Sequence, residues 1–106
     1  MAKYLLEVSY TVEGTKGVLK DGGSKRRKVA QSLIESVGGK MEAFYFAFGE
    51  NDVVVLADLP DNVSAAALSM TLAASGAVAG KSTVLLTPEE IDQATKKSIS
   101  YTPPGR

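Results

Sequence analysis

The sequence contains no cysteine and no histidine among its 106 residues. Without cysteine the chain has no disulfide, no thiolate nucleophile and no cysteine-ligated metal site. Without histidine it lacks the usual general base near neutral pH, a leading zinc ligand and the usual proximal ligand of haem. Histidine-based catalytic triads, histidine-ligated haem and most transition-metal sites are therefore excluded, and we expect neither a metal nor a cofactor.

The sequence also lacks a net charge and a long apolar run. Twelve basic residues balance twelve acidic ones, so the overall charge does not favour nucleic acid or a membrane surface as a partner. No apolar run approaches the roughly 20 residues that span a bilayer, and no signal-peptide core follows Met1. Phe44-Tyr45-Phe46 lacks the basic and glycine positions of an RNA-recognition segment. We expect a cytoplasmic protein that binds no nucleic acid and no membrane.

The length is that of a single domain, which we place at residues 1–97. The remaining residues, 98–106, contain Pro103-Pro104-Gly105 and are predicted to form an extended or mobile tail.

The first third of the chain predicts a strand followed by interrupted helix. Residues 3–12 alternate, with one face formed by Tyr4, Leu6, Val8, Tyr10 and Val12. Residues 14–37 have a helical pattern that Gly22-Gly23 interrupts, after which Ser24 can cap a second segment. The apolar side of that segment consists of Val29, Leu33, Ile34 and Val37, and Gly38-Gly39 ends it.

The rest of the chain predicts a hairpin, a helix, a strand and a final helix. Residues 40–48 and 52–58 are β-rich and are joined by Gly49-Glu50-Asn51. Pro60-Asp61-Asn62 opens a helix that ends at Ser75-Gly76. Its predicted packing side consists of Val63, Ala66, Ala67, Met70 and Ala74. A strand over 80–86 precedes the capping box Thr87-Pro88-Glu89-Glu90, which begins a helix to about Lys97.

This order of elements predicts an α+β fold of ferredoxin-like βαββαβ type, with a four-stranded antiparallel sheet and the helices on one face. The strand over 40–48 is apolar on both sides, with Phe44, Phe46 and Phe48 opposite Met41, Ala43, Tyr45 and Ala47. Since a bare sheet face does not leave large apolar residues in water, a partner must cover it. We expect a homodimer whose sheets face one another around a barrel-like interior, because one self-complementary patch suffices for that contact.

Several motifs together resemble the GYD-domain family of small bacterial proteins. They are Gly22-Gly23-Ser24 with Arg26-Arg27, Gly38-Gly39-Lys40, Glu42 to Gly49, Leu59-Pro60-Asp61-Asn62 and Leu86 to Glu90. The resemblance covers roughly residues 3–95 and implies the dimeric α+β barrel form of the ferredoxin-like fold, without an established activity. Of the glycine, tyrosine and aspartate that name the family, Gly49 and Asp52 are present and Asn51 stands where tyrosine is usual.

Three residues near the hairpin are candidates for chemistry or ligand binding. Asp52 precedes an apolar strand, where a partly buried carboxylate could act as a base. The alternative is a turn aspartate that accepts hydrogen bonds from backbone amides. Tyr45 could form a pocket wall with a polar tip, or could be a core or interface aromatic. Asn51 joins Asp52 and Tyr45 in the enzymatic interpretation considered below.

The basic run Lys25 to Lys28 lies in the first turn of its helix, where cations oppose the helix dipole. Glycine amides at Gly22-Gly23-Ser24 together with Arg26 and Arg27 could therefore bind a carboxylate or phosphate. The alternative is a solvated face whose cations pair with Asp21 or Glu35.

Three classes of function follow. The first is a binding or sensing homodimer that holds a small acidic or aromatic ligand. The second is a metal-free, cofactor-independent enzyme, an isomerase or a monooxygenase, that uses Asp52, Asn51 and Tyr45; it depends on analogy with other dimeric α+β barrels. The third is a structural or assembly protein whose apolar sheet and proline-containing tail contact other subunits.

Overall fold

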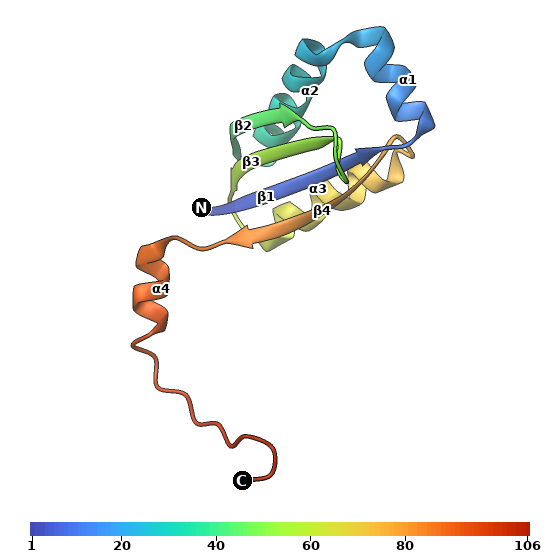
Figure 1. Ribbon diagram of the computed structural model, residues 1–106. Helices are drawn as coiled ribbons and strands as arrows, with labels where there is room; N and C mark the ends of the chain where they lie inside the picture. The colour runs from blue at the N-terminus through green and yellow to red at the C-terminus, as the bar shows by residue number, and fades with distance from the viewer.

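The computed structural model describes residues 1–106 and has an α+β fold built on one open, four-stranded antiparallel sheet (Figure 1). The strand order is β2-β3-β1-β4. The strands are β1 (Ala2–Tyr10), β2 (Lys40–Phe46), β3 (Val53–Leu59) and β4 (Val78–Leu85). The helices are α1 (Val12–Asp21), α2 (Gly23–Ser36), α3 (Asn62–Ala74) and α4 (Pro88–Ala94). The predicted elements are thus present, with differences at their ends.

The first strand ends earlier than the alternation predicts. Thr11 is the N-cap of α1, and its hydroxyl accepts a hydrogen bond from the Gly14 backbone N–H at 3.2 Å. Val12 therefore begins a helix and is 72% exposed, so its predicted place on the same strand face as Tyr4 is wrong. The alternation of apolar and polar residues could not reveal where the strand ends. The end is determined by the cap hydrogen bond of Thr11, which favours the start of a helix over further strand pairing.

The prediction that Ser24 caps the second helix is also wrong. Gly22 alone separates α1 from α2 and is the N-cap of α2, with no side-chain cap hydrogen bond. Its φ of 83° lies in the left-handed region, which glycine adopts without strain. Because the chain becomes helical again at Gly23, Ser24 lies inside the first turn of α2.

A bulge in β2 changes which side chains share a face. Met41 pairs with Ala57 and Ala43 pairs with Leu56, so Glu42 is an extra residue. Residues opposite one another point to the same face, which places Met41 and Phe44 together on the helix side. The expectation that Met41 lies opposite Phe44 is wrong, because strict alternation does not count the inserted residue.

The core lies between one sheet face and the helices α2 and α3. Its buried members are Tyr4, Ile34, Val53, Val55, Ala57, Leu59, Ala65 and Leu68. β3, the strand next to β1 at the centre of the sheet, alternates strictly between buried and half-buried residues. Of the apolar side predicted for α2, Ile34 is buried and Val29 remains 41% exposed beside a cleft.

The packing side predicted for α3 is wrong. The helix buries Ala65 and Leu68, whereas Val63 and Met70 are 78% and 73% exposed. No residue of α3 carries a charge, and apolar residues surround its axis. Hydrophobic spacing therefore could not identify the inner side.

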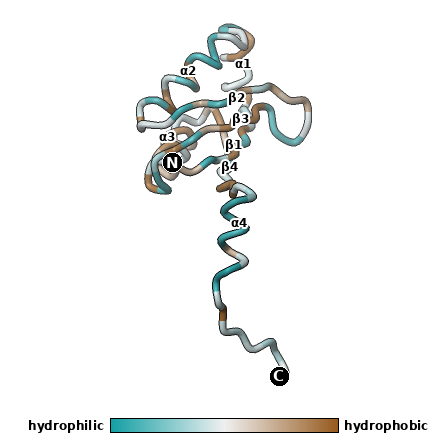
Figure 2. Tube along the Cα trace, turned by 90° about the vertical axis from the view of Figure 1, so that its left-hand side faces the viewer, coloured by the Kyte–Doolittle hydropathy of each residue, from teal (hydrophilic) through white to brown (hydrophobic).

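The C-terminal segment projects away from the sheet. Figures 1 and 2 both show α4 and the chain after it extending from the end of β4, with no helix or strand beyond Ala94. The predicted end of this helix at about Lys97 is three residues late, although the amides of Lys96 and Lys97 continue with tighter turn bonds. None of the helices in the structure combines the length and apolar character that crossing a bilayer requires.

Candidate functional site

A cleft lies between α2 and α3 and is more enclosed than the second cleft described below. α2 packs mainly on β2 and α3 mainly on β4, and the cleft lies between the two helices over parts of β1 and β3. Its cavity volume is about 110 Å³, and 13 of its 18 lining residues are hydrophobic. Leu6 and Val55 belong to its floor, while Leu33 of α2 and Leu72 of α3 belong to opposite walls. We call this hollow the α2–α3 cleft.

Arg26 is the cation of the α2–α3 cleft that has no partner in the chain. Its side chain lines the cleft and is half-buried, and it makes no hydrogen bond or ion pair. Lys81 is also among the lining residues, but it pairs with Glu7, so its side chain points to the other face of the sheet, where its Nζ lies 4.0 Å from Glu7 Oε1. No aspartate or glutamate is among the lining residues. The cleft thus combines an apolar interior with one unpaired positive charge.

Two serines supply a second polar element of the cleft. Ser69 of α3 and Ser82 of β4 both line it, and their Oγ atoms are 3.1 Å apart. In such a pair one hydroxyl donates and the other accepts, so one proton and several lone pairs remain for a further partner. Sequence analysis did not single out either residue. The sequence signal for Ser69 was its position as a polar residue between the apolar Leu68 and Met70.

The other members of the predicted anion site do not join Arg26 in this cleft. Arg27 and Ser24 are exposed and do not line it. Lys25 Nζ lies 3.5 Å from Asp21 Oδ1, which is one of the ion pairs that the solvated-face alternative predicts. The glycine turn and the basic run therefore contribute one side chain, Arg26, to an enclosed surface.

Asp52 lines a second, more open cleft of about 360 Å³ between α1 and the end of the β2–β3 hairpin. Its Oδ2 accepts a hydrogen bond from the Tyr10 backbone N–H at 2.7 Å. Its own backbone N–H donates to Val8 O at 2.8 Å. This geometry is that of the turn aspartate which bonds backbone amides.

Asn51 and Tyr45 lie on the sheet face that α2 and α3 leave uncovered, which we call the open face. Asn51 Nδ2 donates to Glu7 Oε2 at 2.9 Å. Tyr45 is 72% exposed and pairs with Val54, which in turn pairs with Glu7. The carboxylate of Asp52 instead bonds toward the end of β1, so the three hairpin candidates do not converge on one point.

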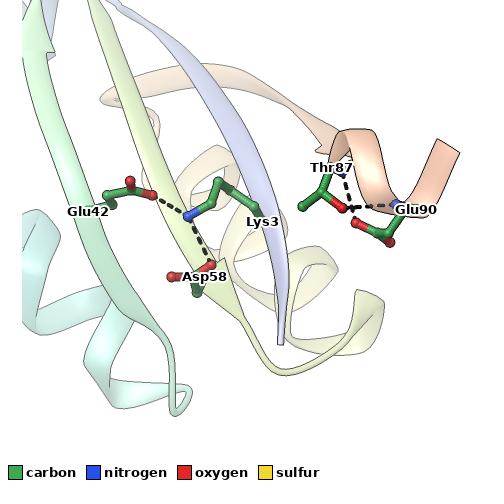
Figure 3. Close-up of polar contacts among 5 residues, drawn as sticks. All are labelled: Lys3, Glu42, Asp58, Thr87 and Glu90. Atoms are coloured by element: carbon green, nitrogen blue, oxygen red, sulfur yellow. Dashed lines mark hydrogen bonds and ion pairs between the residues drawn. The ribbon is translucent and has the colours of Figure 1, made fainter. Parts of the chain in front are cut away.

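A charged cluster occupies the end of the open face near the N-terminus. Lys3 Nζ lies between Glu42 and Asp58, bonding to both, with 3.2 Å to Asp58 Oδ1 (Figure 3). The hydrogen bond with Glu42, followed by that with Asp58, raises the pKa of the Lys3 ammonium. Register explains the grouping, since Lys3 pairs with Asp58 and the bulged Glu42 extends toward them. No group of three or more acidic side chains is arranged to hold a metal ion.

The comparison with family models matches residues 4–95 to the GYD domain. The chain belongs to the GYD domain family. The match begins at Tyr4 in β1 and extends just past α4, so it includes both clefts and all of the open face that follows Lys3. Comparisons with curated proteins and with solved structures give no match.

Proposed function

We propose that this GYD domain protein is a homodimer that binds or senses a small molecule in the α2–α3 cleft. The observation that carries this proposal is the cleft itself, whose lining is mostly apolar and includes the unpaired Arg26. Binding sites for small molecules are concave and mostly apolar, with a few polar groups that fix orientation. Neither a reactive side chain nor a cofactor is needed for this function.

The dimer of this proposal is the α+β barrel form of the ferredoxin-like arrangement. The strand order β2-β3-β1-β4, with α2 and α3 against one face, supports this assignment. The open face presents apolar residues at its centre, where Leu56 pairs with Leu5 and Ala43. Ion pairs at Lys3 and at Lys81 flank that apolar centre. The open face of a second subunit, related by a two-fold axis, would cover this apolar centre.

A titration with benzene tests the binding proposal. We expect benzene to shift the methyl NMR signals of Leu33 and Leu68, which line the cleft. Ala30→Leu fills the cleft and should abolish these shifts. Ala66→Leu is the matched control, because Ala66 is an exposed alanine of α3 outside the cleft. Absence of cleft shifts at saturation in the wild-type protein would contradict the proposal.

Light scattering at micromolar concentration tests the dimer. Leu56→Glu adds a carboxylate to the open face, which already has Glu7, Glu42 and Asp58, and should yield monomers. Val63→Glu changes an exposed residue of α3 and should leave the dimer intact. A wild-type monomer, or equal behaviour of the two variants, would overturn the proposed assembly.

A structural or assembly role is the second candidate, and the projecting C-terminal segment is the observation that favours it. Ile99 and Tyr101, which follow α4, are 80% and 72% exposed, and the chain after α4 lies away from the sheet (Figure 2). Assemblies larger than a dimer in the same scattering experiment would support this candidate. The enzymatic alternative has less support, because Asp52 is engaged with backbone amides while Tyr45 and Asn51 lie on the open face.

A further inference from the structure

We propose that the α2–α3 cleft takes a small aromatic carboxylic acid, held by Arg26 at its charged end and by Ser69 and Ser82 at a second polar group. This inference deepens the proposed function and rests on it. Three features of the cleft carry it: its volume, its unmatched charge and the position of its hydroxyl pair.

The volume limits the size of the ligand. An enclosed apolar cavity of roughly 150 Å³ accommodates benzene. The cleft, at about 110 Å³ and partly open, therefore suits one small ring or a short branched chain. Nucleotides, fused rings and long acyl chains exceed it. The apolar lining on both walls favours a flat or compact apolar body.

The charge determines the kind of polar group. Arg26 is half-buried without a partner, and the lining contains no carboxylate that would compete with a ligand for it or repel an anion. Arginine pairs with carboxylates through two parallel hydrogen bonds. A dianionic phosphate is less suited, because one guanidinium neutralises only part of its charge and moving the remainder into an apolar cleft is costly. A monocarboxylate matches Arg26 in both charge and geometry.

The serine pair gives the ligand a second point of attachment. Arg26 comes from α2, whereas Ser69 and Ser82 come from α3 and β4 on the opposite side of the cleft. The spare proton of the Ser69–Ser82 hydrogen bond and its free lone pairs can bond a hydroxyl. A ring with a carboxylate at one end and a hydroxyl at the other meets both polar elements across the apolar middle.

Calorimetric titrations with three probes test the proposal on the full chain. Benzoate and benzamide have nearly the same shape and differ in charge, and 4-hydroxybenzoate adds a hydroxyl opposite the carboxylate. We expect benzoate to bind at least about tenfold more tightly than benzamide, as a hydrogen bond to a charged group implies. We expect 4-hydroxybenzoate to bind about threefold to tenfold more tightly than benzoate.

Variants locate the effect. Arg26→Gln should remove the preference for benzoate over benzamide. Arg27→Gln is the control: it removes the same charge one residue away, outside the cleft, and should leave the preference for benzoate unchanged. Ser69→Ala combined with Ser82→Ala should remove the preference for 4-hydroxybenzoate. Thr71→Ala is the control, since Thr71 is an exposed residue of α3 that does not line the cleft.

The outcomes separate this inference from the proposed function. Equal affinity for benzoate and benzamide would overturn the acid as ligand class while leaving a binding cleft. Unchanged benzoate affinity in Arg26→Gln would overturn the role of Arg26. If neither these probes nor benzene bind the wild-type protein, the proposed function itself fails.

Discussion

Asp52 accepts the backbone N–H of Tyr10 at 2.7 Å and so joins the start of β3 to the end of β1 through a side chain. The backbone of Asp52 adds two further bonds: its N–H donates to Val8 O, and its carbonyl accepts from the Ala47 N–H, both at 2.8 Å. One residue therefore closes the hairpin and holds it against β1. This is a structural role, which explains an aspartate at the head of an apolar strand.

Replacement of Asp52 should accordingly destabilise the fold. We expect Asp52→Ala to lower the free energy of unfolding by about 1–2 kcal/mol, because a half-buried amide loses an ionised acceptor. Asp52→Asn keeps an acceptor oxygen and should cost less. Urea unfolding measures both. Glu50→Ala is the control, as Glu50 is an exposed acid of the same loop; a stability loss as large as that of Asp52→Ala would contradict a specific role for Asp52.

A second prediction concerns the acid end of the stability profile. Asp61 caps α3, and its Oδ1 accepts the Ser64 backbone N–H at 2.8 Å. The hydrogen bond from the Ser64 backbone lowers the pKa of the Asp61 carboxyl below 3.8. Because the folded pKa is the lower one, this stabilisation is present above the unfolded pKa and is lost as the pH falls through the folded pKa.

The test compares wild-type protein with Asp61→Ala. We expect a lower urea midpoint for the variant at pH 7, and the difference should disappear at acid pH where Asp61 is protonated in the wild-type protein. Asp92→Ala removes an exposed carboxyl of α4 and should change the midpoint little at either pH. A difference between wild type and Asp61→Ala that does not shrink as the pH is lowered would argue against the capping explanation.

The capping motif at the start of α4 was predictable from local sequence, whereas the caps of α1 and α2 and the inner side of α3 were not. The capping box at Thr87 and Glu90 is where the sequence predicts it, because both of its partners lie within three residues of one another. The helix predicted to open at Pro60-Asp61-Asn62 does begin there. The inner side of α3 and the place of Met41 were predicted wrongly. α3 is apolar on all sides, so its inner side can be identified only once the position of the sheet is known. The face on which Met41 lies can be assigned only once the bulge at Glu42 is known.

The candidate site was predicted only in part for a related reason. Arg26 was identified from its cluster of charges, yet the sequence could not separate it from Arg27, since the rotation of α2 about its axis decides which one meets the cleft. Ser69 and Ser82 are 13 residues apart and meet only through the packing of α3 on β4. Contacts between elements of this kind leave no local trace in the sequence.

The capping box of α4 permits a third prediction. The Thr87 hydroxyl accepts the Glu90 backbone N–H at 3.0 Å, and the Glu90 carboxylate accepts the Thr87 N–H at 2.9 Å (Figure 3). α4 has seven residues, none of them buried, so its helicity depends on this cap. Thr87→Ala costs about 1 kcal/mol of helix stability and should reduce the helical population of Glu89–Ala94 several-fold.

The ¹³Cα chemical shifts of α4 measure that population, and thermal unfolding of the sheet is followed in parallel. We expect the unfolding temperature to stay unchanged, because α4 projects from the body (Figure 1). Thr95→Ala, at the other end of α4, is the control for loss of a threonine. A lower unfolding temperature in Thr87→Ala would show that α4 packs against another surface in solution, as the assembly candidate requires.

The two glycines of α1 provide the fourth prediction, because they differ in surroundings within one helix. A Cβ at Gly14 would lie 2.0 Å from Ala77 O and 2.9 Å from Tyr10 Cδ1, whereas a Cβ at Gly17 would meet nothing within 4 Å. Gly14 is buried and lets α1 approach the backbone that precedes β4, where Thr11 N–H donates to Ala77 O at 3.0 Å. This contact attaches α1 to the sheet.

Alanine at the two positions should therefore have opposite effects. Gly14→Ala forces α1 away from Ala77, and we expect it to lower the free energy of unfolding by about 1–3 kcal/mol, as overpacking does. Gly17→Ala removes a flexible residue from a helix interior and should raise the same quantity by roughly 0.5–1 kcal/mol. Urea unfolding of both variants measures the pair. Equal effects would mean that α1 does not rest on Ala77, and the second cleft, which α1 bounds through Thr15 and Val18, would then lose its wall.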